Sequence, residues 1–361
     1  MPSRSASVGV VGAGAATQAI HLPTVARFPE LQVTAVTDVD QEVAAAVAGR
    51  VGATAVPTLA DMLTPRAPDV VVICTPNAFH AEQVMAACRA GARAVLCEKP
   101  LATSRQEAEA VAEVSRETGV PVVVGTMHAY DPAWQAATRR WAESGASAHT
   151  VRIAAHIPPN PSTEDLATEV AGRPAASAGR ATSARPTLEE RLARLRGGVL
   201  GLAIHDLPLA RQLLPDASPR VIAVREPAPG GYVILADVGG RHLEVLGGST
   251  RTWLPDWTLE AIADDAALRA DFGPSYVHGE SAVVELSEAS GEAGFTGSRL
   301  GPATENGYVR LWRAICDILD GRTAPPVLDT LVADLDLAVQ LADRATEVLV
   351  SHEAATAEVT A

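Results

Sequence analysis

The stretch that decides the fold is residues 7–17, which read Ser-Val-Gly-Val-Val-Gly-Ala-Gly-Ala-Ala-Thr. Its first part, Ser7–Val11, is an apolar run typical of a buried strand, and Gly12 and Gly14 follow at once. A glycine-rich turn between a strand and a helix lets backbone N–H groups approach a pyrophosphate. Thr17 occupies the third position of this fingerprint, where glycine is usual. The stretch therefore predicts the first strand and phosphate loop of a dinucleotide-binding domain.

A second predicted strand, Val33–Thr37, ends on Asp38. An acidic residue at the tip of this strand, about 20 residues after the glycines, is placed to bind the ribose hydroxyls of NAD. The same carboxylate would repel the extra phosphate of NADP. Asp38 could instead cap the helix that begins at Gln41, although Asp40 can fill that role. The combined context favours NAD binding.

Strand and helix patterns continue to alternate through residue 125. Further apolar strands are predicted at Val70–Cys74, Ala94–Cys97 and Val122–Val124, with helical stretches between them. Such alternation implies a parallel sheet with helices on both faces. We therefore expect an α/β Rossmann domain over residues 1–125.

Several polar residues follow the strand ends. Asn77 is a predicted N-cap for a helix over residues 78–90, and Thr103 with Gln106 predicts a capping box for the next helix. His80 falls in the first turn after Asn77, at the sheet edge where ligands of such folds bind. It is either a cofactor contact or a histidine that only bonds the turn.

The run Ala-Val-Leu-Cys-Glu-Lys-Pro, residues 94–100, contains Lys99, the only lysine among 361 residues. All the other basic residues are arginine. Arginine can serve most solvated roles of lysine, but it cannot supply a compact point charge with a tunable pKa. The alternative is that Lys99 is an ordinary surface lysine with no chemical role. The contrast with the rest of the chain favours a chemical role for Lys99.

Composition excludes several classes of protein. The chain is 47% apolar and 20% charged, as in ordinary globular proteins, and its formal charge of −14 argues against a nucleic-acid surface. We find no apolar run of the roughly 18 residues that a membrane span needs. The four cysteines have no paired spacing and no histidine pattern for a metal, so we expect reduced thiols and no metal site. A strand beginning near Ser7 leaves no room for a signal peptide, and the expected compartment is the cytoplasm.

The pattern changes after Gly125. A helix is predicted from Asp131-Pro132 to Ser144 and a strand at Val151–Ile157. Pro158–Pro186 lacks periodicity and is interpreted as a long excursion or lid. Thr187 and Glu190 predict a capping box for a short helix.

That short helix is expected to end at Gly197-Gly198, before an apolar helix that reaches Leu214. Strand-like runs separated by glycine pairs over residues 220–258 predict a largely antiparallel meander. Two helices, Tyr308–Leu319 and Leu331–Val350, are expected to close the fold, followed by a polar tail after Ser351.

Several separated stretches together resemble one family, the glucose–fructose oxidoreductase / inositol dehydrogenase (Gfo/Idh/MocA) family. The matching stretches are Gly-Ala-Gly at 12–14, Asp38, Thr75-Pro76-Asn77 with His80, Glu98-Lys99-Pro100, Tyr130-Asp131-Pro132, Gly197-Gly198 with His205-Asp206, and the C-terminal helix pair. The resemblance implies a Rossmann domain over residues 1–125 and, over 126–361, an α/β domain with a large open, mostly antiparallel sheet. That sheet often packs face to face in the family, so a homodimer or homotetramer is expected.

The resemblance also implies roles for individual residues. The cofactor NAD would contact Gly12, Gly14, Ala15, Ala16, Asp38, Thr75, Pro76, Asn77, His80, Glu98 and Lys99. The substrate would contact Lys99, His128, Tyr130, His205 and Asp206. Lys99 and His205 are the expected catalytic residues, since histidine can take an alcohol proton at neutral pH and an ammonium can stabilise a developing alkoxide.

The sequence departs from the family in two places. Many relatives carry an aspartate four residues before the histidine, on the same helical face, whereas this chain has Gly201. Ala129 stands where relatives often have an arginine. The alternative that His205 is only a structural histidine of the helix stays open, because its expected partner is missing.

Three functions are therefore open. The first is an NAD(H)-dependent oxidoreductase acting on a hydroxyl or keto carbon of a sugar-like or cyclic small molecule. The second is redox-neutral elimination or hydrolysis through a transient ketone, with tightly bound NAD. The third is a non-catalytic NAD-responsive binding protein, against which Lys99 argues, since a sensor needs no tunable amine.

Overall fold

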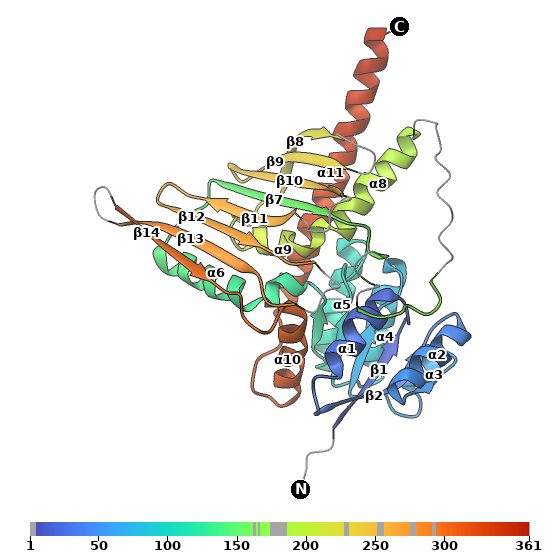
Figure 1. The fold of residues 1–361 in the computed structure, drawn as a ribbon. Helices are drawn as coiled ribbons and strands as arrows, with labels where there is room; N and C mark the ends of the chain where they lie inside the picture. Colours follow the sequence, from blue (N-terminus) through green and yellow to red (C-terminus); the bar gives the residue numbers. More distant parts are fainter. Residues whose placement is uncertain are drawn as a thin grey trace.

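The structure is a computed structural model that describes residues 5–161, 164, 167–173, 186–226, 231–250, 256–274, 279–290 and 294–360. Two sheets dominate it, a parallel one in the first part of the chain and a larger mixed one in the second (Figure 1). This arrangement confirms the predicted fold class. None of the helices in the described ranges is both long and apolar enough to cross a membrane.

The first sheet is parallel throughout and has the strand order β3-β2-β1-β4-β5-β6. Its strands are β1 (Ala6–Val11), β2 (Leu31–Thr37), β3 (Thr54–Ala55), β4 (Val70–Ile73), β5 (Ala94–Cys97) and β6 (Val122–Val124). Strands β4, β5 and β6 are fully buried, because continuous apolar runs leave no polar face for solvent. The carboxyl ends of β1, β4 and β5 therefore meet at one edge.

Helices connect these strands on both faces of the sheet (Figure 1). They are η1 (Thr17–His21), α1 (Leu22–Val25), α2 (Gln41–Val51), α3 (Leu59–Leu63), η2 (Asn77–Phe79), α4 (His80–Arg89) and α5 (Arg105–Thr118). Asp40 caps α2 by accepting from two backbone N–H groups, and Gly52 ends it with a φ of 68°. Local signals thus set the bounds of most of these helices.

The second sheet has eight strands in the order β14-β13-β12-β11-β7-β10-β9-β8. They are β7 (Thr150–Ile157), β8 (Pro219–Arg225), β9 (Tyr232–Val238), β10 (Arg241–Ser249), β11 (Asp256–Ile262), β12 (Ala266–Asp271), β13 (Val283–Ser290) and β14 (Gly294–Leu300). All neighbours are antiparallel except β7 and β10. The meander predicted up to residue 258 therefore continues through β12, β13 and β14, which the sequence patterns had not indicated.

Helices cover one face of this second sheet and leave the other face open (Figure 1). The remaining helices are η3 (Met127–Tyr130), α6 (Pro132–Ser144), α8 (Leu188–Gly201), η4 (Ala203–His205), α9 (Leu207–Arg211), α10 (Gly307–Leu319) and α11 (Leu328–Thr360). One of these helices, α10, packs against the first sheet. Its residues Val309, Leu311 and Trp312 belong to the core under that sheet. The two halves of the chain therefore share a core through α10.

Two capping predictions were wrong by a few residues. Asn77 begins the short turn η2 instead of capping a long helix, and α4 starts only at His80. The cap of α5 is Ser104, whose hydroxyl accepts from the N–H of Glu107. The Glu107 carboxylate accepts from the N–H of Thr103, the residue before the cap, so the helix cap lies one residue further along than predicted.

Two helix ends also differ from the predictions. Helix α8 does not stop at Gly197-Gly198 but runs on to Gly201, after which η4 and α9 replace the single apolar helix that was expected. The region after Ser351 continues α11 to Thr360 and is not a tail. Tertiary packing explains the first difference, as the surroundings of Gly198 show.

The ring of Tyr232 on β9 lies between two glycines. A Cβ atom at Gly198 would come within 2.5 Å of Cε1 of Tyr232, and one at Gly247 within 2.2 Å of its Cζ. The Tyr232 hydroxyl also donates to the carbonyl of Gly198 at 3.1 Å. Gly198 therefore lets α8 approach the sheet closely, which offsets the helix propensity that a glycine loses.

This packing predicts opposite effects for two neighbouring substitutions. Gly198→Ala forces the methyl group against the buried Tyr232 ring and should lower the free energy of unfolding by about 1–3 kcal/mol. Gly197→Ala meets nothing within 4 Å in the same helix and should raise it by about 0.5–1 kcal/mol. Urea unfolding of both variants measures the difference, and equal effects would contradict the packing argument.

Candidate functional site

A cavity of about 220 Å³ opens at the carboxyl ends of β4 and β5, between the two sheets. Residues of both halves of the chain line it: Ala16, Ile20, Cys74, Thr75, Asn77, His80, Glu98, Lys99, Ile157, Asn160, Gly201, Leu202, His205, Trp257 and Tyr308. A larger groove of about 820 Å³ lies elsewhere, between α5 and α11, and its arginines are paired with acidic residues. The smaller cavity brings together the predicted catalytic residues and is the candidate site.

Lys99 enters this cavity directly after β5. Its Nζ donates to the carbonyl oxygen of Gly201 at 2.6 Å, across the two domains. Burial lowers the pKa of the Lys99 ammonium below its ordinary value, and the charge of Glu98 opposes that effect. The chain's only lysine is thus half-buried and held by a neutral acceptor, with donors left for a ligand.

The neighbouring Glu98 carboxylate forms the centre of a polar chain. Nε2 of His21 lies 2.9 Å from Oε1 of Glu98, and the indole N–H of Trp312 donates to Nδ1 of His21 at 3.2 Å. The backbone N–H of Lys99 donates to Oε2. Burial alone would raise the pKa of Glu98, but the bond from His21 and the nearby charges lower it on balance. Glu98 is therefore an anion beside the ammonium of Lys99.

His21 completes this chain as a neutral donor. Burial lowers the pKa of its imidazole, but Cys74 and Glu98 outweigh burial and raise that pKa to about 10, which by itself would favour an imidazolium. The hydrogen bond that the ring accepts decides for the neutral form. The bond from Trp312 determines which nitrogen carries the proton, because an imidazolium has no lone pair to accept an indole N–H. With Nδ1 accepting, Nε2 is the nitrogen that donates to Glu98.

His205 lies in η4 and faces the cavity with one nitrogen only. Its side chain is 6% exposed, and its Nδ1 is enclosed without a hydrogen-bond partner among the described residues. Only Nε2 can therefore meet a ligand. Burial, followed by the charges of Lys99 and His128, lowers the pKa of His205 well below 6.5. At neutral pH the ring is uncharged and can accept a proton.

Asp206 is fully buried and serves another histidine. Its carboxylate lies 2.6 Å from Nδ1 of His128 and accepts from the indole of Trp257 at 2.6 Å. His128 stacks on Phe272, with ring centroids 3.9 Å apart, and its ring lies 6.0 Å from that of His205. The buried carboxylate therefore orients His128, not His205.

The β1 end of the sheet has the features that NAD requires. Gly12 has a φ of +92°, and a Cβ atom there would lie 2.4 Å from the carbonyl oxygen of Cys74. Gly14 is exposed, with nothing within 4 Å of a Cβ position, so a phosphate can approach its backbone. The Asp38 carboxylate accepts from the N–H groups of Ala13 and Asp40 and keeps lone pairs for ribose hydroxyls. The residues present fit the cofactor.

The turn after β4 lines the same cavity. Thr75 and Asn77 face it, and the Thr75 hydroxyl donates to the side chain of Gln83. Both ring nitrogens of His80 are occupied by backbone carbonyls, Nδ1 by Pro100 at 2.6 Å and Nε2 by Thr75 at 2.7 Å. His80 therefore ties the two loops of the site together. This favours the interpretation that His80 bonds the turn and does not contact the cofactor.

Three predicted substrate residues are not among those lining this cavity. Asp206 is enclosed with both oxygens bonded, so it cannot touch a ligand. Tyr130 packs against the core under the first sheet, where burial and the charge of Asp334 raise its pKa. His128 lines an adjoining cavity of about 240 Å³, which shares only Tyr308 with the first.

Sequence reasoning missed His21, Trp312 and Trp257. A local signal existed for His21, a polar residue inside the apolar run Ala-Ile-His-Leu-Pro that follows the glycine loop. Trp312 gave no such signal, since a tryptophan in an apolar helix is normally core. Its contact with His21 joins residues 291 positions apart.

Comparison with known proteins matches the first part of the chain to a family. The family model described as "Oxidoreductase family, NAD-binding Rossmann fold" (GFO_IDH_MocA) matches residues 6–126. Residues 6–126 are therefore similar to the NAD-binding Rossmann domain of this family, which confirms the predicted resemblance for that part of the chain.

Individual relatives match part of the chain. Inositol 2-dehydrogenase 3 of Saccharopolyspora erythraea is 39% identical over 130 residues, which cover 36% of this chain and 38% of that protein. The 1,5-anhydro-D-fructose reductase of Ensifer adhaerens is 33% identical over 168 residues, 45% of this chain and 43% of that one. The chain thus spans less than half the length of these relatives.

Solved structures extend the likeness of fold to nearly the whole chain. A 3-ketoreductase of Actinomadura kijaniata in complex with NADP superposes with a TM-score of 0.69 at 18% identity, covering 93% of this chain and 96% of that one. A putative myo-inositol dehydrogenase of Sinorhizobium meliloti gives 0.68 at 21% identity, covering 95% and 98%. Both chains have the two-domain fold described above.

The lowered pKa of His205 predicts a pH-dependent stability. The unfolded chain binds a proton at this residue near pH 6.5 and the folded chain does not, so the free energy of unfolding falls as the pH drops below 6.5. One such group contributes a slope of at most about 1.4 kcal/mol per pH unit. We expect His205→Gln to flatten the fall between about pH 6.5 and 5 in urea unfolding.

His242→Gln serves as the control, because His242 is exposed on β10 and does not line the cavity of Lys99. It should leave the slope of the parent protein unchanged. Parallel curves for the parent and His205→Gln would show that His205 titrates in the folded protein as it does in the unfolded chain.

Proposed function

We propose that this protein is an NAD(H)-dependent oxidoreductase that acts on a hydroxyl or keto carbon of a sugar-like or cyclic metabolite. Residues 1–125 would bind the cofactor, and residues 126–361 would bind substrate and mediate assembly. The observation that carries the proposal is the meeting of Lys99 and His205, from different domains, in one cavity at the carboxyl ends of the Rossmann strands.

The residues of the site would share the chemistry in a simple way. NAD, when bound, accepts or supplies the hydride. Gly12, Gly14 and Asp38 would hold its phosphates and adenosine ribose, and Asp38 would disfavour NADP. Lys99 would donate a hydrogen bond to the reacting oxygen and stabilise its developing negative charge. Nε2 of His205 would take the hydroxyl proton during oxidation and return it during reduction.

The absence of a carboxylate at position 201 affects the proton transfer. A protonated His205 would lie beside Lys99 without the compensating charge that relatives place four residues earlier. The carbonyl of Gly201 accepts from Lys99 but carries no formal charge. This favours a second candidate, redox-neutral chemistry through a transient ketone, in which the proton is soon returned. Turnover without net NADH absorbance would distinguish it.

The exchange of Lys99 for arginine tests the proposal. Lys99→Arg keeps the positive charge, but its wider guanidinium would misplace the donor by an ångström or more. We expect a loss of turnover on the order of 100-fold, with a far smaller change in NADH affinity. Turnover is measured on a panel of inositols, sugars and their keto forms with NAD(H) and NADP(H), and affinity by NADH fluorescence.

Two further variants serve as comparisons for Lys99→Arg. Lys99→Ala should lose at least as much turnover as Lys99→Arg. Arg139→Lys exchanges the same two side chains at an exposed position of α6 and should change neither quantity. Near-normal turnover of Lys99→Arg would mean that Lys99 only balances charge.

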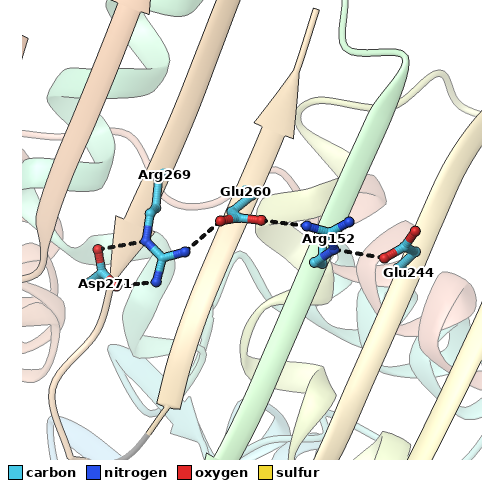
Figure 2. Close-up of polar contacts among 5 residues, drawn as sticks. All are labelled: Arg152, Glu244, Glu260, Arg269 and Asp271. Carbon is cyan, nitrogen blue, oxygen red and sulfur yellow. Dashed lines mark hydrogen bonds and ion pairs between the residues drawn. The ribbon is translucent and has the colours of Figure 1, made fainter. Parts of the chain in front are cut away.

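We also propose a homodimer or homotetramer formed through the open face of the second sheet. On this face Figure 2 shows Glu244, Arg152, Glu260, Arg269 and Asp271 in a row of alternating charge across β10, β7, β11 and β12. Exposed pairs of this kind add little stability to a monomer. Ile222 and Ile262, 44% and 38% exposed, add apolar surface on β8 and β11.

Reversal of the central charge tests this interface. Glu260→Arg would place three guanidinium groups side by side and should shift the protein toward the monomer in sedimentation analysis. Glu143→Arg makes the same change on the exposed side of α6 and should leave the assembly intact. A thermal melt of each variant separates loss of assembly from loss of folding, and an unchanged oligomer for Glu260→Arg would refute the interface.

A further inference from the structure

The segment after β7 returns from the second sheet to the Rossmann domain (Figure 1). We call the described residues between Pro158 and Arg173 the strap. At its start, Asn160 lines the cavity beside Lys99. Near its end, Ala171 packs against the core under the first sheet. The strap therefore spans the side of the Rossmann domain on which the glycine loop lies.

Gln18, in η1, connects the strap to the glycine loop. Its Nε2 donates to the carbonyls of Ala13 at 2.7 Å and of Ala171 at 3.0 Å. Its Oε1 accepts from the N–H of Ala171 at 2.9 Å and from Nη1 of Arg50 at 3.0 Å. Both amide protons and both lone pairs are used, and a flipped amide would oppose all four partners.

This bonding pattern couples the strap to the glycine loop. Gln18 is 3% exposed and binds both polar groups of Ala171, as a neighbouring strand would. The third partner, the carbonyl of Ala13, belongs to the loop between Gly12 and Gly14. Any movement of the strap at Ala171 is therefore transmitted to the phosphate loop through one rigid amide.

The strap has a second point of attachment on α2. Nη1 of Arg50 donates to the carbonyl of Glu169 at 2.8 Å. Gly172, with a φ of +71°, packs so closely on α2 that a Cβ atom there would lie 2.2 Å from Cγ2 of Val43. Val43 is in the first turn of the helix that follows Asp38. The strap thus extends from the Lys99 cavity to the expected adenosine end.

We propose that the strap is part of the cofactor-binding site and that Gln18 is its positioning residue. The inference rests on the proposed binding of NAD. A dinucleotide that reaches from Lys99 to Asp38 crosses the glycine loop and lies beneath the strap. It leaves only when the bonds at Ala171 and Glu169 open. The strap therefore retains the dinucleotide, and cofactor exchange is slower than in a Rossmann domain with an open cleft.

The rate of NADH release tests this inference. The protein is loaded with NADH, mixed with excess NAD⁺, and followed by stopped-flow fluorescence. Gln18→Leu keeps the shape of the side chain but removes its four hydrogen bonds. Gly172→Ala places a methyl group against Val43, so it displaces the strap from α2 without changing the glycine loop. We expect each to speed release about 10-fold, the equivalent of about one net hydrogen bond.

Each variant has a matched control. Gln32→Leu makes the same exchange at an exposed position of β2. Gly145→Ala has the same backbone strain, at a φ of +74°, with nothing within 4 Å of the new methyl group. Neither control should change the release rate. Hydrogen exchange of the cofactor-free protein gives an independent readout, because the Ala171 amide should lose protection in Gln18→Leu.

The outcomes separate the possibilities. Faster release in Gln18→Leu alone, with Gly172→Ala matching Gly145→Ala, would mean that Gln18 acts only on the glycine loop, and the strap would have no part. Unchanged release in both variants would overturn the inference entirely. A parent protein that binds no NADH would refute the proposed function instead, while loss of Ala171 protection would still report on the strap.

Discussion

The burial of the Glu98 carboxylate is the constraint on which the site depends. A carboxylate removed from water must be paired and hydrogen-bonded, and here His21 and the N–H of Lys99 meet that need. His21 in turn requires the indole of Trp312. The glycine-loop helix, strand β5 and helix α10 are thereby fixed to one another, and Lys99 enters the cavity from a rigid base.

A second buried carboxylate organises the other side of the cavity in a different way. Asp206 belongs to the same short turn as His205, yet it bonds His128 and Trp257. His205 is left with an enclosed nitrogen that has no partner in the part of the chain that the structure describes, and an uncharged ring is its stable form at neutral pH. The site thus combines the rigidly positioned ammonium of Lys99 with His205, a base whose protonated form no neighbouring carboxylate stabilises.

Much of the fold could be predicted because its signals are local. Apolar runs predicted β1, β2, β4, β5 and β6 to within two residues, and Asp131 and Thr187 marked the starts of their helices correctly. The errors came where packing overrides propensity. Gly198 looked like a helix end, but the Tyr232 ring needs the space that a glycine leaves.

By itself the sequence determined the alternation of strands and helices, the phosphate loop and the single lysine at a strand end. These are patterns of neighbours, and chain geometry converts them directly into position. Only the tertiary structure decided which partner each buried polar group takes. The His21 bond to Glu98 spans 77 residues, and the Gln18 bond to Ala171 spans 153. Such pairings depend on which faces meet when the core closes, and no local periodicity encodes them.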